Sequence, residues 1–119
     1  SDPSITAYTN GILATAAGKH EEALNHYKEA ISHDPTSYRA YFSQGATQAH
    51  FKQFQQALES YDRALELNPQ YTEAYYNKGN LFYGFGQYDQ AMTCYSSAIR
   101  SNPKFINAYY NKGSIFLLK

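Results

Sequence analysis

Three histidines, His20, His26 and His33, lie within one short stretch of the chain. Imidazole nitrogens are common zinc ligands, and ligands supplied by one helix must share a face to reach the same ion. No two of the three histidines are four residues apart, so they do not form the i, i+4 pair that a helical zinc site uses. The pattern favours surface histidines, and we predict no metal site.

Two other features have the residue types of a catalytic site without its arrangement. The glycines of Gly79 to Gly86 have the spacing that opens a phosphate-binding loop, but Phe85 and Gly86 replace the Lys-Ser/Thr pair that would hold phosphate and magnesium. Cys94 directly precedes an apolar-stripe tyrosine, Tyr95, and we expect it to be an inert, partly buried thiol. We therefore predict no catalytic residue and no cofactor.

The overall charge also excludes classes of partner. Ten basic and ten acidic residues cancel, which gives no electrostatic basis for binding a nucleic acid or an anionic membrane. The sequence contains 13 Tyr and 7 Phe, and tyrosine is suited to half-buried positions and wet binding surfaces. The single Cys94 forms no intramolecular disulfide, and no apolar run of about 18 residues is present. The chain begins without Met and is interpreted as a fragment, with the cytoplasm as its default compartment.

A fixed spacing of 34 residues organises the whole chain. The glycines Gly11, Gly45, Gly79 and Gly113 are separated by it, and the motif Tyr-Tyr-Asn-Lys-Gly occurs both at 75–79 and at 109–113. An Ala, Tyr, Ala series and an Asp/Asn-Pro pair follow at the same spacing, ending at Pro35, Pro69 and Pro103. A strict period of this length indicates a stacked array of helix-turn-helix units.

These columns of Gly, Ala, Tyr, Ala and Pro resemble the tetratricopeptide repeat (TPR) family. The resemblance implies an all-α fold, a right-handed α-solenoid of antiparallel helix pairs, in a single domain. We expect repeats at 4–37, 38–71 and 72–105, and the first helix of a fourth repeat at 106–119. The first repeat departs from the pattern. It has Ala7 at the position that is occupied in the later repeats by Tyr41, Tyr75 and Tyr109. Gln48 likewise stands in the column of Phe82 and Phe116.

Apolar stripes and turn residues place the helices. In the second helix, Ala23, Tyr27 and Ala30 fall on one face, and the helix must end before Pro35 because proline disfavours helical geometry in the preceding residue. We expect a disordered lead-in at 1–4. The predicted helices span 5–17, 20–33, 38–51, 54–67, 72–85, 88–101 and 106–118.

In TPR superhelices the first helix of each pair lines the concave face. The resemblance therefore places columns of residues, spaced by 34 positions, on that face. One is the aromatic series Tyr8, Phe42, Tyr76 and Tyr110, and the next contains Ser43, Asn77 and Asn111. Asn77 and Asn111, with Asn80 beside them, resemble the asparagine ladders that hold peptide backbones. An amide supplies two donors and an acceptor for this purpose. Two alternatives stay open: that the asparagines simply face water, and that the aromatic column packs between helices.

Arg39 is the one obvious cation expected in this groove, which gives nine candidate peptide-binding residues: Tyr8, Arg39, Phe42, Ser43, Tyr76, Asn77, Asn80, Tyr110 and Asn111. TPR domains that bind chaperone tails hold a terminal carboxylate with Lys and Arg. Neither is present at the matching places, and Glu73 would repel a carboxylate. An acidic chaperone tail is therefore not the expected ligand.

The last predicted helix has no partner helix in the sequence. Burying one Ile, Leu or Phe is worth about 1.5 to 3 kcal/mol, so the apolar run Ile115, Phe116, Leu117 and Leu118 favours any available cover. We expect this segment to mediate self-association, giving a possible homo-oligomer.

The leading hypothesis is a non-enzymatic scaffold that binds a peptide segment of a partner protein in its concave groove. Two alternatives remain. One is a structural self-assembly module that associates through its last helix. The other is the substrate-recruiting arm of a larger enzyme, such as a glycosyltransferase, which the asparagine ladder's resemblance to glycosyltransferase TPR arms permits.

Overall fold

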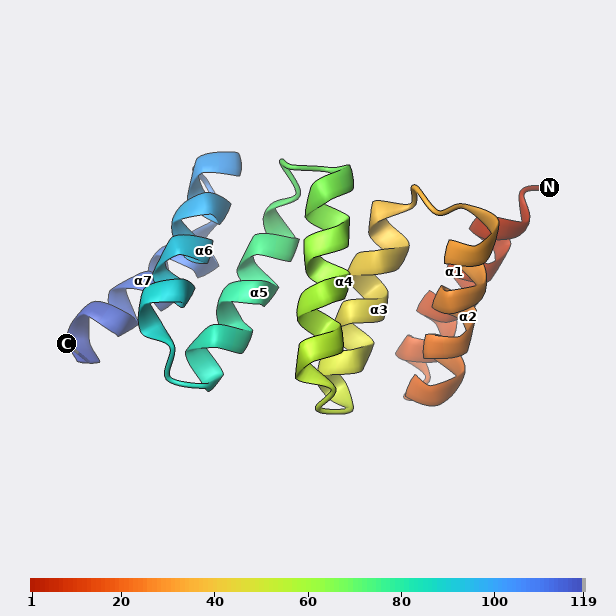
Figure 1. Ribbon diagram of the computed structural model, residues 1–119, viewed down its shortest axis with the longest axis horizontal. Coiled ribbons are helices and arrows are strands. Elements are labelled where there is room, and N and C mark those ends of the chain that lie inside the picture. Colours follow the sequence, from red (N-terminus) through yellow and green to blue (C-terminus); the bar gives the residue numbers. More distant parts are fainter. Residues whose placement is uncertain (119) are drawn as a thin grey trace. The chain divides into compact units, whose positions relative to one another are not determined.

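The computed structural model describes residues 1–118, which fold into seven α-helices without a β-strand (Figure 1). In chain order they are α1 (Pro3–Ala16), α2 (His20–His33), α3 (Tyr38–His50), α4 (Phe54–Leu67), α5 (Thr72–Gly84), α6 (Tyr88–Ser101) and α7 (Ile106–Leu118). None of these described helices is both long and apolar enough to cross a bilayer. The predicted all-α fold class is confirmed.

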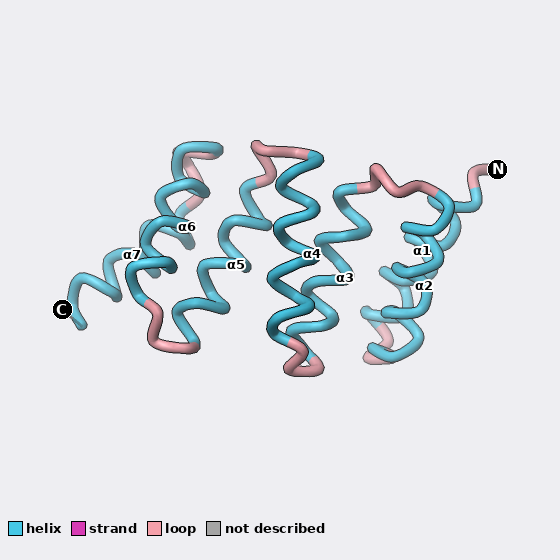
Figure 2. The backbone as a smooth tube through the Cα atoms, in the orientation of Figure 1, coloured by secondary structure: helices cyan, strands magenta, loops and turns pink. Residues whose placement is uncertain are grey.

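The chain packs into two compact units, Ser1–Leu67 (unit 1) and Asn68–Lys119 (unit 2). Unit 1 contains the antiparallel pairs α1–α2 and α3–α4, with α2 also packed on α3. Unit 2 contains the pair α5–α6, with α7 packed on α6. Short loops join the helices within each unit (Figure 2). The expected series of sequential pairs with one extra helix is therefore present.

The lead-in at 1–4 is not disordered, which corrects the prediction. The Asp2 carboxylate accepts a hydrogen bond from the Ser4 amide at 2.9 Å, and Pro3 opens α1. An Asp N-cap followed by proline in the first turn is a strong helix start, so the signal was present in the sequence. The later helix bounds agree with the prediction to within a residue.

The turns inside the pairs use a left-handed residue at one repeated position. Gly18 and Gly86 have φ values of 76° and 73° there, and the equivalent residue in the second repeat is Lys52, with φ of 62°. A side chain in this region carries a steric cost that glycine avoids. Lys52 is thus a strained point in unit 1.

The Asp/Asn-Pro pairs between repeats form one kind of turn. The side-chain oxygens of Asp34, Asn68 and Asn102 each accept a hydrogen bond from the backbone amide two residues later, at 3.0, 3.2 and 3.1 Å. Such a bond imitates a backbone turn. The motif therefore ends one helix pair and sets the chain direction for the next.

The core consists of small residues packed around three tyrosines, one from the second helix of each pair. Tyr27, Tyr61 and Tyr95 have at most 2% of their surface exposed. The alanines that flank them in the predicted stripes are also buried: Ala23, Ala30, Ala57, Ala64, Ala91 and Ala98. The predicted apolar faces are confirmed, and the tyrosine rings are the largest side chains that they bury.

Gln48, which breaks the aromatic column, belongs to a buried polar contact in unit 1. The Ser60 hydroxyl donates to Gln48 Oε1 at 2.6 Å and accepts from Gln44 Nε2 at 3.0 Å. The equivalent positions in unit 2 are Phe82 and Cys94, so both members of the pair change together. A buried amide needs a partner, which explains why Gln48 and Ser60 occur in the same repeat.

Candidate functional site

A glycine and a tyrosine position the surface on which the predicted site residues lie. A Cβ at Gly79 would lie 2.7 Å from Tyr95 Cε1, closer than a side chain tolerates, and Gly45 stands in the same relation to Tyr61. The missing Cβ lets the tyrosine ring of the second helix cross beneath the first helix. Its hydroxyl therefore reaches the side of the unit formed by the first helices.

The aromatic column is largely packed against these tyrosines. Ring centroids are 6.0 Å apart for Tyr8 and Tyr27, 5.8 Å for Phe42 and Tyr61, and 5.9 Å for Tyr76 and Tyr95. Tyr8, Phe42 and Tyr76 are accordingly half-buried. The alternative that these rings pack between helices is the one observed.

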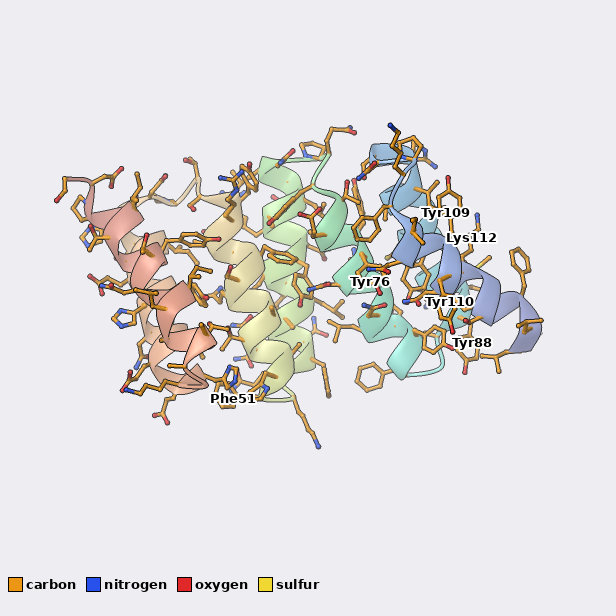
Figure 3. The ribbon with its side chains drawn as sticks, turned by 180° about the vertical axis from the view of Figure 1, so that it is seen from behind. Phe51, Tyr76, Tyr88, Tyr109, Tyr110 and Lys112 are labelled. Carbon is orange, nitrogen blue, oxygen red and sulfur yellow. The ribbon has the colours of Figure 1, made fainter. Side chains whose placement is uncertain are left out.

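Tyr110 differs from the other members of its column. It lies on α7, where no second helix supplies a tyrosine within unit 2, and it is 75% exposed. Figure 3 shows Tyr76 and Tyr110 together with their neighbours in unit 2. An exposed ring of this size is available to a ligand, whereas Tyr76 mainly supports the fold.

In unit 2 the Tyr95 hydroxyl lies at the centre of a hydrogen-bond network between α5, α6 and α7. The hydroxyl donates to Asn80 Oδ1 at 2.6 Å, and Asn111 Nδ2 donates to the same oxygen at 2.9 Å. Asn111 Nδ2 also lies 3.4 Å from the Tyr95 hydroxyl and 3.3 Å from that of Tyr76. The network fixes two of the predicted asparagines, Asn80 and Asn111, in one orientation.

Burial raises the pKa of Tyr95 to about 12, from the ordinary value of 10.0, and the hydrogen bond with Asn111 partly offsets this effect. In unit 1, burial likewise raises the pKa of Tyr27, while hydrogen bonds with Thr15 and Ser43 lower it. A phenolate is poorly solvated at either position, since a buried charge loses its water. Both hydroxyls therefore act as neutral hydrogen-bonding groups.

Unit 1 has a hollow at the place where unit 2 has its network. The hollow, of about 360 Å³, lies between α1 and α3 with the Tyr27 ring from α2 in its lining. Ile12, Phe42 and Ala46 are apolar residues of its wall. We call it the unit 1 pocket.

A second, larger hollow of about 610 Å³ lies beside the turn between α1 and α2. Its lining includes Lys19, Glu21 and Glu22, which are exposed charges of both signs. His20 and His50 line both hollows, and their rings stack with centroids 3.8 Å apart. The histidine stack therefore forms a wall shared by the two.

The remaining predicted peptide-binding residues are distributed over both units. Ser43 lines the unit 1 pocket, and Arg39 is exposed on α3 with its guanidinium 5.4 Å from the Tyr38 ring. Asn77 is half-buried on α5. The structure thus brings Phe42 and Ser43 together in unit 1, and Tyr76, Asn80 and Asn111 together in unit 2.

Sequence reasoning did not select several residues of this surface. Tyr95 was assigned only to the core, although its hydroxyl joins the network. His20 and His50 belong to different predicted helices, so no spacing rule connects them. Ile12 and Ala46 stand 34 residues or a multiple from Asn80, so the sequence placed them in its column on the same face, but only Asn80 was selected for binding.

Several large apolar side chains of the α7 helix are exposed. Phe116, Leu117 and Leu118, from the predicted self-association set, are 63%, 90% and 58% exposed. Ile115 is instead fully buried against the core around Tyr95, so it is not part of this face. The prediction treated the four residues as one run, whereas a helix turns one of them inward.

His26, His33 and Cys94 lie outside this surface, whereas His20 and His50 line the unit 1 pocket. His26 and His33 lie 4.0 and 3.9 Å from the two carboxylate oxygens of Glu29. Among residues 1–118, no group of three His, Cys, Asp or Glu side chains is arranged to hold a metal ion. Cys94 is buried, 7% exposed.

Sequence and structure comparisons agree on one family. A tetratricopeptide repeat model matches residues 8–72, a second one matches residues 60–93, and a TPR repeat model matches residues 79–119. No curated protein sequence matches the chain at a significant level.

Solved structures that resemble the chain include two crystal structures of MamA. They are 29% and 30% identical, with TM-scores of 0.88 and 0.86, and cover 94% and 92% of this chain. The chain spans only 66% and 60% of their length.

Two further structures share the fold at 21% identity and a TM-score of 0.93 each. The first TPR of Spaghetti (RPAP3), bound to the HSP90 peptide SRMEEVD, covers 99% of this chain and is itself covered to 94%. The match to the Arabidopsis OM64 TPR domain covers 98% of this chain and 96% of that domain. With its repeated Gly–Tyr packing and the family model that spans more than half of its length, the chain belongs to the tetratricopeptide repeat family.

Proposed function

We propose that the chain is a non-enzymatic protein-interaction module that holds an extended peptide segment of a partner protein. The first-helix side of each unit offers a site for such a segment by itself: α1 and α3 in unit 1, and α5 and α7 in unit 2. Membership of the TPR family supports an interaction role, and one structural neighbour holds a peptide. An acidic tail like that neighbour's HSP90 peptide is not the proposed ligand, because the candidate residues include one cation, Arg39.

The observation that carries the proposal is the network in unit 2. It uses one nitrogen of Asn111 and the oxygen of Asn80, so the Asn111 oxygen and the Asn80 nitrogen lie outside it. Together these atoms offer an acceptor and donors matched to the N–H and C=O groups of a peptide backbone. Because the network already orders both amides, binding costs little additional side-chain entropy.

The test starts from a ligand selected for the module itself. Random dodecapeptides displayed on phage are selected on the wild-type chain, and the enriched peptide is synthesised and titrated by fluorescence polarisation. We expect Asn77→Ala combined with Asn111→Ala to weaken its binding more than tenfold, with helicity by circular dichroism unchanged.

Asn107→Ala is the matched control, since Asn107 is an exposed asparagine on α7 outside the network. Its affinity should stay within about twofold of the wild type, well below the tenfold change that corresponds to 1.4 kcal/mol. An unchanged affinity in the double variant, or the failure of repeated selections to enrich any peptide, would remove the proposed function.

A second candidate function, self-assembly through α7, is favoured by a separate observation. Among the described residues, nothing lies within 4 Å of the place where a Cβ of Gly113 would stand, whereas Gly79 and Gly45 are covered by tyrosines. Tyr109 and Phe116 are exposed on the same helix. In a symmetric pair of α7 helices, an aromatic ring from the second copy would cover Gly113, continuing the contact that the inner repeats make.

Sedimentation velocity over a concentration series tests this candidate. We expect a concentration-dependent dimer that Phe116→Asp abolishes, because a carboxylate would have to be buried in the contact. Ile5→Asp is the control, since Ile5 in unit 1 is also 63% exposed. A monomer at all concentrations, or equal effects of the two substitutions, would reject self-assembly through α7.

A further inference from the structure

The unit 1 pocket combines an apolar wall with hydroxyl groups that are already hydrogen-bonded. The Thr15 hydroxyl donates to the Gly11 carbonyl at 3.0 Å and lies 2.9 Å from the Tyr27 hydroxyl. The Thr47 hydroxyl donates to the Ser43 carbonyl at 2.9 Å. Covering these three hydroxyls, of Thr15, Tyr27 and Thr47, with an apolar ligand breaks none of these hydrogen bonds, which keeps the penalty for burying polar groups small.

The absence of acidic and strongly basic side chains from the described lining of the pocket also favours an apolar ligand. None of its described lining residues is an Asp, Glu, Lys or Arg. The nearest charged lining, Lys19, Glu21 and Glu22, belongs to the other side of the His20–His50 stack. A Lys side chain entering the pocket would lose water without gaining a partner of opposite charge, and a Glu side chain would meet only the rings of His20 and His50.

The volume of the pocket suits a single peptide side chain better than a bulky cofactor or metabolite. Its volume of about 360 Å³ is near the lower end of the range for ligand sites. Ile12 keeps 42% of its surface exposed, so part of the apolar wall of the pocket is in contact with water. Covering Ile12 together with the ring of Phe42 would remove apolar surface from water.

We propose that the unit 1 pocket is a specificity site and takes one uncharged aliphatic side chain, of the leucine or methionine type, from a peptide bound on unit 1. This inference rests on the proposed peptide-binding function and adds its side-chain preference. The backbone contacts in unit 2 are tolerant of sequence, whereas the pocket discriminates by hydrophobicity and by the absence of charge.

The probes are terminally blocked heptapeptides Ser-Thr-Ser-Xaa-Ser-Thr-Ser in which Xaa is Leu, Ala, Lys or Glu. Binding to the full chain is followed by NMR through the methyl signals of Ile12 and Ala46 and the side-chain amide signals of Asn111. The leucine peptide should shift both methyl signals and bind about tenfold more tightly than the alanine peptide, which corresponds to the burial of an aliphatic side chain. The lysine and glutamate peptides should bind no better than the alanine peptide.

Ala46→Leu fills the pocket and should bring the leucine-to-alanine affinity ratio close to one. Ile12→Ala, at an exposed position that the fold tolerates, should reduce the same ratio at least threefold. Ala16→Leu adds the same atoms at an exposed site at the end of α1, outside the pocket, and should leave the ratio unchanged.

The outcomes separate this inference from the proposed function. If all four peptides bind equally and shift Asn111 but not Ile12, the pocket assignment is wrong while peptide binding stands. The same conclusion follows if Ala46→Leu leaves the ratio at its wild-type value. If no peptide shifts any of the three residues and phage selection also enriches none, the proposed function fails together with the inference.

Discussion

In unit 1 the Tyr27 hydroxyl is bonded to Thr15, whereas in unit 2 the Tyr95 hydroxyl is bonded to Asn80 and Asn111. The two tyrosines occupy equivalent places and cross beneath equivalent glycines, Gly11 and Gly79. The residue one position after the glycine differs: it is Ile12 in one repeat and Asn80 in the other. An isoleucine cannot bridge two helices by hydrogen bonds, so unit 1 keeps a hollow and unit 2 closes it with amides.

The opposite side of the first helices shows the reverse distribution of polarity. There unit 1 buries the hydrogen-bonded pair Gln48 and Ser60, while unit 2 has Phe82 and Cys94 at the same places. One helix-pair scaffold therefore accepts a polar pair on either side, provided that both partners are present. The Gly–Tyr packing is common to both units and stabilises the fold. The residues in the neighbouring columns differ between the units and determine which side is polar.

The largest effect should come from the shared scaffold. In Gly79→Ala the new Cβ would meet Tyr95 at 2.7 Å and the Cys94 Cβ at 3.2 Å, and the fully buried ring has little room to move. We expect the free energy of unfolding to fall by about 1 to 3 kcal/mol, the usual cost of overpacking. Urea denaturation of the wild-type chain and of Gly79→Ala measures this loss of stability.

Gly113→Ala is the matched control, because Gly113 has the same place in its repeat but no covering tyrosine among residues 1–118. It should raise the free energy of unfolding by up to about 1 kcal/mol, through helix propensity alone. Equal effects of the two substitutions would mean that the Gly–Tyr contact does not hold the pairs together.

The next effect distinguishes the two surfaces. Asn80→Ala removes the acceptor for both the Tyr95 hydroxyl and Asn111 Nδ2, and should cost about 1 to 2 kcal/mol of unfolding free energy. Ile12→Ala removes a side chain that is 42% exposed and should cost less than about 1 kcal/mol. Thermal and urea denaturation should rank the variants in this order. The opposite order would show that the unit 1 wall, not the unit 2 network, supports the fold.

A smaller effect should separate the two tyrosines by pH. The folded-state pKa of Tyr95 is raised to about 12, above its unfolded value near 10, so its contribution to stability is fully present below pH 10 and is lost as the pH rises toward 12. Tyr95→Phe should therefore flatten the fall in stability between pH 10 and 12 more than Tyr27→Phe does. Denaturation midpoints across this range, with phenolate absorbance near 295 nm, measure the difference. Indistinguishable pH profiles of the two variants would contradict it.

The smallest effect concerns the turns inside the pairs. Lys52 in unit 1 has a positive φ where unit 2 has Gly86. Lys52→Gly should relieve the steric cost and raise the free energy of unfolding by about 0.5 to 1 kcal/mol, the relief exceeding the entropy that glycine adds to the unfolded chain. Lys19→Gly, one residue after the left-handed Gly18, gives the control and should not stabilise the chain. A loss of stability in Lys52→Gly would indicate that the lysine side chain makes a compensating contact.

Most of the fold could be predicted from the sequence because its signals are local and repeated. The period located every helix to within about two residues, and the Asp/Asn-Pro turns and the Ala-Tyr-Ala stripes are present as expected. The one error at the N-terminus came from neglecting the Asp2-Pro3 cap. The same counting placed Asn80 and Asn111 in neighbouring columns, but whether they face water or each other depends on side chains from three helices.

The repeat of 34 residues was enough to predict the helix pairs, their order and the columns on their first helices, because each pair is specified through its nearest neighbours. The exposure of each column, in contrast, could be known only from the packing of the helices. Tyr8, Phe42 and Tyr76 became supports while Tyr110 stayed exposed, and Ile115 turned inward while Phe116 turned outward. The exposure of a side chain depends on whether a second helix packs over it. Equivalent motifs along the chain have the same residues whether or not such a helix is present, so the motif alone does not predict exposure.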